Sequence, residues 1–328
     1  MLSKSKTTLR DMSAEFLGTM VLMLFGLGVN AQVTLGKVSV PLSQGDLGRF
    51  VEKITEFQYG DYLSINFGWG VGVMLAVYVA GGVTGAHINP AVTIAMACRR
   101  TFSWNRVVPF ITAQMLGAFV ASAIVYGVYY EQIQNLEAVV ATESEVSVGV
   151  DGSRYQGKSS DKASHHTMAT AGIFGTYPRS FSNLDPETIS NWTGLLDQIV
   201  GTAILLLVIC AVGDVRNLAP QSNIGPMVVG ALVLMIGLSF GSNCGYAINP
   251  ARDLSPRLFT YVAGWGSQVF KDPNTLWYLV PVVGPIIGGI LGVITYDQLI
   301  SRFHEPESES ESESESELGR GDNLEGVQ

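Results

Sequence analysis

The chain has 328 residues, of which 47% are hydrophobic and only 14% are charged, and its mean hydropathy is +0.30. Soluble domains carry about 25% charged residues, so this composition excludes an ordinary soluble protein and favours one embedded in a lipid bilayer. The formal net charge of −9 argues against nucleic-acid binding, and much of it comes from a Ser/Glu alternation between Glu305 and Glu317.

Six apolar runs are long enough to cross a bilayer, which requires about 20 residues. They cover about 12–32, 62–82, 107–128, 193–213, 224–243 and 276–298. No cleavable signal peptide is apparent before the first run, which is itself about as long as a full span. It is therefore interpreted as a signal anchor that follows a short cytosolic segment, residues 1–11.

Polar segments separate the spans at about 33–61, 129–190 and 213–223. In the second of them, expected outside the cell, His165 and His166 have no cysteine or carboxylate at ligand spacing. We therefore expect both histidines to be solvated, and we expect no metal site. An Asn-Trp-Thr sequon begins at Asn191, but it abuts the fourth span, which hinders glycosylation.

An Asn-Pro-Ala motif occurs twice, and a short apolar segment follows each copy, at 89–98 and 249–260. A segment of this length makes about 15 Å of helix, which is too short to cross a membrane. Asparagine caps helix starts well, and proline is favoured at the first helical position. The motifs therefore predict two re-entrant half-helices that begin inside the membrane. The motif residues are Asn89, Pro90, Ala91, Asn249, Pro250 and Ala251.

The two halves of the chain resemble each other. "AEFLGTMVLMLFGLG" at 14–28 is echoed by "DQIVGTAILLLVICAVG" at 197–213, and each half contains three spans. An odd number of spans gives the repeats opposite orientations, and such repeats place a solute site near the midplane. The sequence thus predicts an all-α membrane protein with six transmembrane helices and two re-entrant half-helices. The inverted repeats are expected at about 12–128 and 193–302.

If the two half-helices start from opposite sides and meet, their asparagine amides converge. Each side-chain carbonyl caps its own helix, which leaves the NH₂ group to point elsewhere. Each helix start also carries about half a positive charge. A pore passing this point offers hydrogen bonds to water or hydroxyls and repels cations and protons.

These features together resemble the major intrinsic proteins, the aquaporin family, across about residues 10–302. "TGAHINPAVTIA" at 84–95 is similar to the matching stretch of the glycerol-conducting aquaglyceroporin branch, and so is the aspartate in "NPARD". The resemblance implies a right-handed helix bundle that conducts glycerol, related small neutral solutes and water passively. It also implies a homotetramer with one pore per subunit. We expect no enzymatic activity and no cofactor.

By the same resemblance, four positions form a selectivity filter outward of the asparagines. They are Trp69, Gly237, Tyr246 and Arg252. Gly237 stands where water-selective members have histidine, so we expect it to open the ring. Trp69 and Tyr246 supply an apolar wall, and Arg252 supplies fixed donors. The alternatives are a lipid-interface anchor for Trp69 and a structural ion pair for Arg252.

Further positions follow from the resemblance. Glycerol channels differ from water channels at the positions of Asp253, Arg257, Pro281 and Val282. Glu15 is expected to hold the first re-entrant loop. Its repeat partner, usually glutamate, is Gln198 with Asp197 alongside, which puts the support of the second loop in doubt. His87 is expected to line the inner mouth, where it hydrogen-bonds the loop or, alternatively, senses pH.

Small residues give two more expectations. Cys98, Cys210 and Cys244 are interpreted as small buried hydrophobes. Glycines spaced four residues apart in the fifth and sixth spans favour close helix packing, and in the fifth span they also leave lumen space. These glycines are Gly237, Gly241, Gly245, Gly284, Gly288 and Gly292.

Residues 303–328 form an acidic, Ser/Glu-rich segment of low complexity, which predicts a disordered cytosolic tail. Its serines followed by glutamates resemble acidic-directed kinase sites; a passive solubilising tail is the alternative. Lysine and arginine in the short loops lean toward both termini being cytosolic, and we expect the plasma membrane as the location.

Two other classes of function compete with a passive channel. A coupled secondary transporter also uses inverted repeats, but it requires an intramembrane carboxylate near the solute, and Glu15 is assigned to loop support. An adhesive protein with a vestigial pore is disfavoured because the filter residues are intact.

Overall fold

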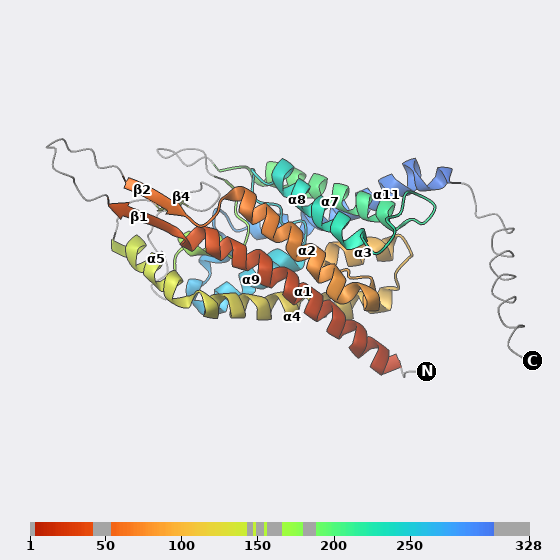
Figure 1. The fold of residues 1–328 in the computed structure, drawn as a ribbon, viewed down its shortest axis with the longest axis horizontal. Helices are drawn as coiled ribbons and strands as arrows, with labels where there is room; N and C mark the ends of the chain where they lie inside the picture. The colour runs from red at the N-terminus through yellow and green to blue at the C-terminus, as the bar shows by residue number, and fades with distance from the viewer. Residues whose placement is uncertain are drawn as a thin grey trace, which may run out of the picture.

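The structure is a computed structural model that describes residues 4–41, 54–142, 147–148, 154–155, 166–179 and 188–304. Among these residues, six long helices run side by side in an elongated bundle, and two short helices lie within it (Figure 1). The long helices are α1 Lys4–Leu35, α2 Tyr62–Thr84, α4 Val107–Val128, α7 Asn191–Gly213, α8 Gly225–Phe240 and α11 Val280–Leu299. The short helices are α3 Pro90–Cys98 and α9 Pro250–Thr260.

The predicted spans and half-helices are thus confirmed, with two differences in length. α1 begins at Lys4, eight residues before the predicted span at residue 12, because its first turns form a polar extension. There Asp11 accepts hydrogen bonds from Arg10 and from Arg106, whose Nη2 lies 2.6 Å away. α8 has only 16 residues because the chain turns at Gly241 and stays non-helical up to Asn249. Within the described residues, five helices other than α8 are long and apolar enough to cross a membrane.

The polar segments at about 33–61 and 129–190 contain structure of their own. The first holds an antiparallel hairpin of β1 Lys37–Pro41 and β2 Ile54–Gln58, with Lys37 opposite Gln58. The second holds α5 Tyr130–Thr142, the short antiparallel strands β3 Ser147–Val148 and β4 Arg154–Tyr155, and α6 Met168–Ala171. A further short helix, α10 Gln268–Lys271, follows α9. These elements lie at the end of the bundle opposite the start of α1 and the end of α11 (Figure 1).

The halves of the chain are interlocked through the short helices. α3 of the first half packs against α11 of the second half, and α9 of the second half packs against α4 of the first. α2 and α8 cross at two glycines: a Cβ on Gly70 would lie 2.8 Å from the Gly230 carbonyl oxygen, and one on Gly230 2.7 Å from that of Gly70. This reciprocal pattern is what two inverted repeats produce.

Glycines in the last span set its distance from α7. A Cβ built on Gly288 would collide with the carbonyl oxygen of Ile199, and one on Gly292 with that of Ala203. Small residues let membrane helices approach closely enough for backbone contact. The packing role predicted for the glycines of the sixth span agrees with these contacts.

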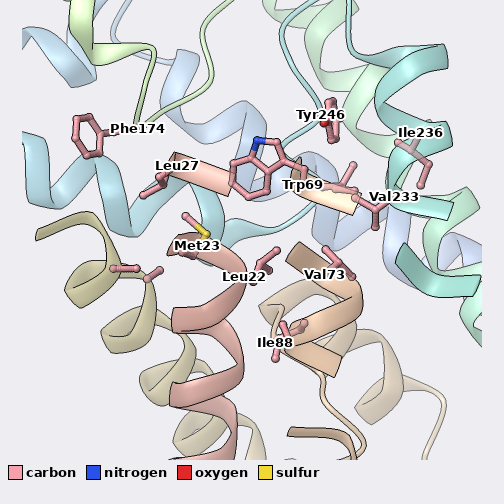
Figure 2. Close-up of a cluster of buried hydrophobic side chains, with 14 of the residues drawn as sticks. Leu22, Met23, Leu27, Trp69, Val73, Ile88, Phe174, Val233, Ile236 and Tyr246 are labelled. Carbon is pink, nitrogen blue, oxygen red and sulfur yellow. The ribbon is translucent and has the colours of Figure 1, made fainter. Parts of the chain in front are cut away.

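The buried core runs along the axis of the bundle and includes aromatic side chains. Figure 2 shows Trp69 at the centre of this cluster, with Leu27 of α1 on one side and Tyr246 on the other. Trp69 is 4% exposed and Tyr246 8%. The core therefore surrounds the place where the filter was predicted.

The prediction for His166 is wrong. Its side chain is 2% exposed, stacks on Trp265 with ring centroids 4.1 Å apart, and has Nε2 3.0 Å from the Tyr126 hydroxyl. The cause is tertiary: His166 begins a segment, 166–177, that folds back onto the bundle and is buried along most of its length. His165 lies outside the described residues.

The predictions for the cysteines and for the acidic tail have different outcomes. Cys210 and Cys244 are buried as expected, but Cys98, the last residue of α3, is exposed. The tail from residue 305 onward lies outside the described residues, and the chain before it ends in a 3₁₀ turn at Ser301–Phe303.

Candidate functional site

The two short helices begin in the middle of the bundle with the same cap. Asn89 Oδ1 accepts a hydrogen bond from the Ala91 amide at 2.8 Å, and Asn249 Oδ1 accepts one from the Ala251 amide at 3.0 Å. Both asparagines have extended backbones, and a proline follows each at the first helical position. Side-chain capping satisfies amides that would otherwise be unpaired inside the membrane.

The asparagine amides also tie the two helix starts together. Asn89 Nδ2 donates to the Ile248 carbonyl at 2.8 Å, and Asn249 Nδ2 donates to the Ile88 carbonyl at 2.9 Å. Each NH₂ group thus points away from its own helix, as expected, and bonds the loop of the other half. Each NH₂ carries two hydrogens, so one hydrogen per amide remains for a solute.

The isoleucines that accept these bonds share an uncommon backbone conformation. Ile88 has a φ of 43° and Ile248 a φ of 42°. A left-handed conformation is a genuine outlier for a β-branched residue and costs about 1–3 kcal/mol. Its presence at the same motif position in both halves indicates that the surrounding hydrogen bonds impose it.

Glu15 of α1 holds the first loop. Its carboxylate accepts hydrogen bonds from the backbone amides of His87 at 3.0 Å and Ile88 at 2.7 Å. It also accepts from the Thr84 hydroxyl at 2.7 Å and from Gln114 Nε2 at 2.8 Å. Four donors saturate this buried carboxylate.

Gln198 of α7 occupies the equivalent place beside the second loop but bonds differently. Its Oε1 accepts from the Ile248 amide at 3.0 Å, while its Nε2 donates to the Gly245 carbonyl at 2.8 Å. An amide offers both a donor and an acceptor, whereas a carboxylate only accepts. The neighbouring Asp197 accepts from Asn243 Nδ2 at 3.1 Å and adds to the support of this loop.

Two chambers lie along the bundle axis. The inner chamber, about 260 Å³, reaches the loop after α3 at Thr101 and Phe102, and the outer chamber, about 80 Å³, is lined in part by segment 166–177. The residues that line both chambers are Trp69, Tyr246 and Arg252. These three side chains therefore form the junction between the chambers.

The junction is an aromatic and cationic surface. The Arg252 guanidinium carbon lies 4.1 Å from the centroid of the Trp69 ring, and Arg252 Nη1 donates to the Phe174 carbonyl at 3.3 Å. A guanidinium on an indole face is attracted by the negative ring face. Donors at the free edge of Arg252 thus stand beside two apolar rings, which suits a solute with hydroxyls on a carbon chain.

Gly237 lies behind this junction and lines neither chamber. A Cβ at this position would lie 2.5 Å from Cζ of Tyr246 and would collide with Oδ1 of Asn66. The expectation that Gly237 itself opens the ring is therefore corrected. Its missing side chain makes room for the Tyr246 ring, and the ring in turn forms the wall.

The four positions associated with glycerol channels lie away from the chamber walls. Asp253 and Arg257 form a fully buried ion pair, with Nε 2.8 Å from Oδ1. Asp253 also accepts from the Thr176 amide at 2.7 Å, and Arg257 donates to the Thr176 carbonyl at 2.6 Å. The pair thus fixes segment 166–177 onto α9. Pro281 and Val282 lie in the first turn of α11 and line neither chamber.

His87 lines the inner chamber beside Asn89. Its Nδ1 lies 3.1 Å from the Thr93 hydroxyl, and its ring packs against Phe102 with centroids 4.6 Å apart. The side chain is therefore bonded to Thr93 of α3, and both the loop-bonding and the pH-sensing role of His87 stay predictions.

Sequence reasoning missed several residues that shape the site. Asn30, Asn66 and Gln114 interrupt apolar spans and are buried. A polar residue inside a membrane helix is costly unless it is partnered, so this signal was present in the sequence. Segment 173–176 contributes mainly backbone carbonyls, which leave no signature in residue type.

Comparisons with known proteins agree with this geometry. The family description "Major intrinsic protein" matches residues 2–296. The chain is 38% identical to aquaporin-9 of Homo sapiens, covering 91% of this chain and 84% of that protein. It is 38% identical to aquaporin-7 of Mus musculus, covering 90% and 81%. The X-ray structure of the aquaglyceroporin from Plasmodium falciparum is similar with a TM-score of 0.66 at 28% identity, covering 89% of this chain and 97% of that one.

Proposed function

The chain belongs to the major intrinsic protein family, whose members are membrane channels and not enzymes, and on that premise we propose that it conducts glycerol, related small neutral solutes and water. Flux is passive, runs in either direction, and excludes ions and protons. One observation carries the proposal: Trp69, Tyr246 and Arg252 are the residues that line both chambers.

The chemistry of the junction supports a polyol. The carbon chain of glycerol packs against the two aromatic rings, and its hydroxyls meet the donors of Arg252. The non-helical stretch before Asn249 supplies backbone at the chamber wall, including Gly245 and Ala247. Irregular backbone is tolerated in a membrane where it lines a wet cavity.

The centre of the bundle supports the exclusion of cations. α3 and α9 both direct their N-termini to the place where Asn89 and Asn249 cross-bond. Each N-terminus carries about half a positive charge, and the Arg252 guanidinium adds a full charge close by. A cation or hydronium ion at this point meets positive potential, and among the described residues no carboxylate lines either chamber.

The bonding of Glu15 supports a passive channel over a coupled transporter. A coupling carboxylate must bind and release a proton or cation during each cycle. Glu15 already accepts four hydrogen bonds that hold the first loop in place. Exchange of a cation at this site would release the loop that carries Asn89.

Location and assembly follow as further parts of the proposal. The protein is an integral, multi-pass membrane protein. We propose the plasma membrane as its location, both termini in the cytosol, and a homotetramer with one pore per subunit. In Figure 1 the start of α1 and the end of α11, near the two ends of the described chain, lie at the same end of the bundle, which supports the same-side orientation.

Stopped-flow light scattering on proteoliposomes tests the proposal. Vesicles shrunk in hyperosmotic glycerol should re-swell faster with the protein than without it, at a rate independent of any Na⁺ or proton gradient. The initial flux of glycerol should rise linearly with the glycerol concentration difference across the membrane. Saturation together with dependence on an ion gradient would support a transporter instead.

A further inference from the structure

Asn30 is a buried polar residue of α1 that no filter motif contains. Its side chain is 7% exposed and lines the outer chamber. Its Oδ1 accepts a hydrogen bond from Nε1 of Trp69 at 3.1 Å, and its Nδ2 donates to the carbonyl of Ile173 at 3.1 Å. Both functional ends of the amide are thus used, one on the filter tryptophan and one on segment 166–177.

We propose that Asn30 is a positioning residue that sets the orientation of the Trp69 ring and thereby the preference of the junction for glycerol over water. The inference rests on the proposed function, because it assigns selectivity to a junction that conducts both solutes. Asn30 acts through Trp69.

The indole of Trp69 is held by α1. A buried tryptophan N–H requires a partner, and Asn30 supplies it. Gly26 lies one turn earlier on the same face of α1, and a Cβ there would collide with the benzene edge of the Trp69 ring. α1 therefore seats the ring at Gly26 and anchors its N–H at Asn30, which fixes the ring plane from two points.

Arg252 holds the face of the Trp69 ring. The Arg252 guanidinium stacks on the Trp69 face, and Arg252 donates to the carbonyl of Phe174. Asn30 donates to the carbonyl of the preceding residue, Ile173. Two consecutive carbonyls of one segment thus hold the two partners of the Trp69 ring, and Asn30 keeps the ring in register with Arg252.

Replacing Asn30 removes the hydrogen-bond acceptor of the Trp69 indole. With leucine at position 30, the Trp69 N–H is buried without its partner. The outer chamber, which Trp69 and Asn30 both line and which is about 80 Å³, offers space on the side of the lost partner. A ring turned toward this chamber places a donor in the apolar wall and narrows the path of a CHOH group, whereas water passes and can bond the N–H.

The test is a double-mutant cycle on glycerol and water permeability in proteoliposomes. Asn30→Leu should lower glycerol permeability by about fivefold to tenfold, and water permeability by less than about twofold. Trp69→Phe has no indole N–H, so adding Asn30→Leu to it should leave the glycerol-to-water ratio unchanged. Ser122→Ala is the matched control, because this buried hydroxyl bonds within its own helix, to Ala118 at 2.8 Å.

The outcomes separate this inference from the proposed function. The inference is overturned if Asn30→Leu changes the glycerol-to-water permeability ratio equally in the wild-type and the Trp69→Phe backgrounds. It is also overturned if Asn30→Leu lowers the glycerol and the water permeability by the same factor. If Asn30→Leu does not yield folded protein, Asn30→Ser, whose hydroxyl is too short to reach the indole, takes its place in the cycle. A wild-type protein that conducts no glycerol would instead contradict the proposed function.

Discussion

At Gly237 the shape of the proposed junction depends on a neighbour's side chain. The Tyr246 ring occupies the space that a side chain at position 237 would fill. Replacing Gly237 with histidine therefore forces the tyrosine toward the lumen and adds a polar edge. We expect Gly237→His to lower glycerol permeability by at least about tenfold, which corresponds to about 1.4 kcal/mol in the barrier, and water permeability by only a few-fold.

Paired stopped-flow measurements of both solutes on equal amounts of folded protein check this. Gly127→His is the control, because a Cβ at Gly127 meets no atom within 4 Å and the residue is exposed near the end of α4. If glycerol permeability stays high in Gly237→His, Tyr246 does not form the wall of the constriction.

The raised pKa of Glu137 predicts how the stability of the protein depends on pH. Burial raises the pKa of this carboxyl above its ordinary value of 4.5, although the Thr170 hydroxyl and the Thr167 amide donate to it. The fold therefore favours the protonated form. The contribution of Glu137 to stability is highest at pH values below its pKa in the unfolded chain. It falls as the pH rises through its pKa in the folded protein. The contribution of Glu137 to the melting temperature should therefore rise as the pH is lowered from neutrality toward 4.5.

Glu137→Gln should remove this part of the pH dependence, as measured by thermal unfolding in detergent at a series of pH values. His166 Nδ1 lies 4.0 Å from the same carboxylate, so the series is repeated in a His166→Gln background. Identical pH slopes for wild type and Glu137→Gln in both backgrounds would contradict the direction given for Glu137.

At the scale of elements, the α7–α11 contact depends on bare backbone. A methyl group on Gly288 would collide with the carbonyl of Ile199. Gly288→Ala should therefore separate the helices and cost about 1–3 kcal/mol as an overpacked contact. Gly82→Ala in α2, where a Cβ meets nothing within 4 Å, should be neutral or stabilising, since alanine is the better helix former. Thermal unfolding of the two variants in one detergent compares them, and similar melting temperatures would refute a tight α7–α11 contact.

The elements that sequence predicted best are those with strong local signals. Long apolar runs located the six spans, and the asparagine caps with following prolines located the starts of α3 and α9 at Pro90 and Pro250. The polar composition of residues 129–190 as a whole hid segment 166–177, in which six of the twelve residues are apolar. Its place on the bundle depends on the distant partners Asn30 and Arg252, which bond the carbonyls of Ile173 and Phe174.

The site was predictable to a similar degree. Trp69, Tyr246 and Arg252 could be placed because they stand at fixed spacing from the motifs, and they meet at the chamber junction. The position of Gly237 behind Tyr246 could not be predicted, because it depends on the rotamer of a residue in another segment. The same holds for Asn30, whose role depends on two tertiary hydrogen bonds.

At the scale of the whole molecule, the two halves are related but not equivalent. Asn89 and Asn249 bond each other's loops in the same way, and Ile88 and Ile248 share one backbone conformation. The supports differ, because Glu15 offers a carboxylate where Gln198 offers an amide. Segment 166–177 braces Arg252 on the outer side, and no described residue of the inner side does so. The outer end of the pore is therefore the more constrained end, and it carries the junction.

The central claim is that this junction passes glycerol while the crossed helix starts exclude protons. Both can be measured in the same vesicles, with light scattering for glycerol entry and a trapped pH-sensitive dye for proton leak. The account predicts glycerol entry much faster than in protein-free vesicles and a proton leak equal to theirs at every protein-to-lipid ratio. Glycerol entry no faster than in protein-free vesicles, or a proton leak that grows with the amount of protein, would contradict it.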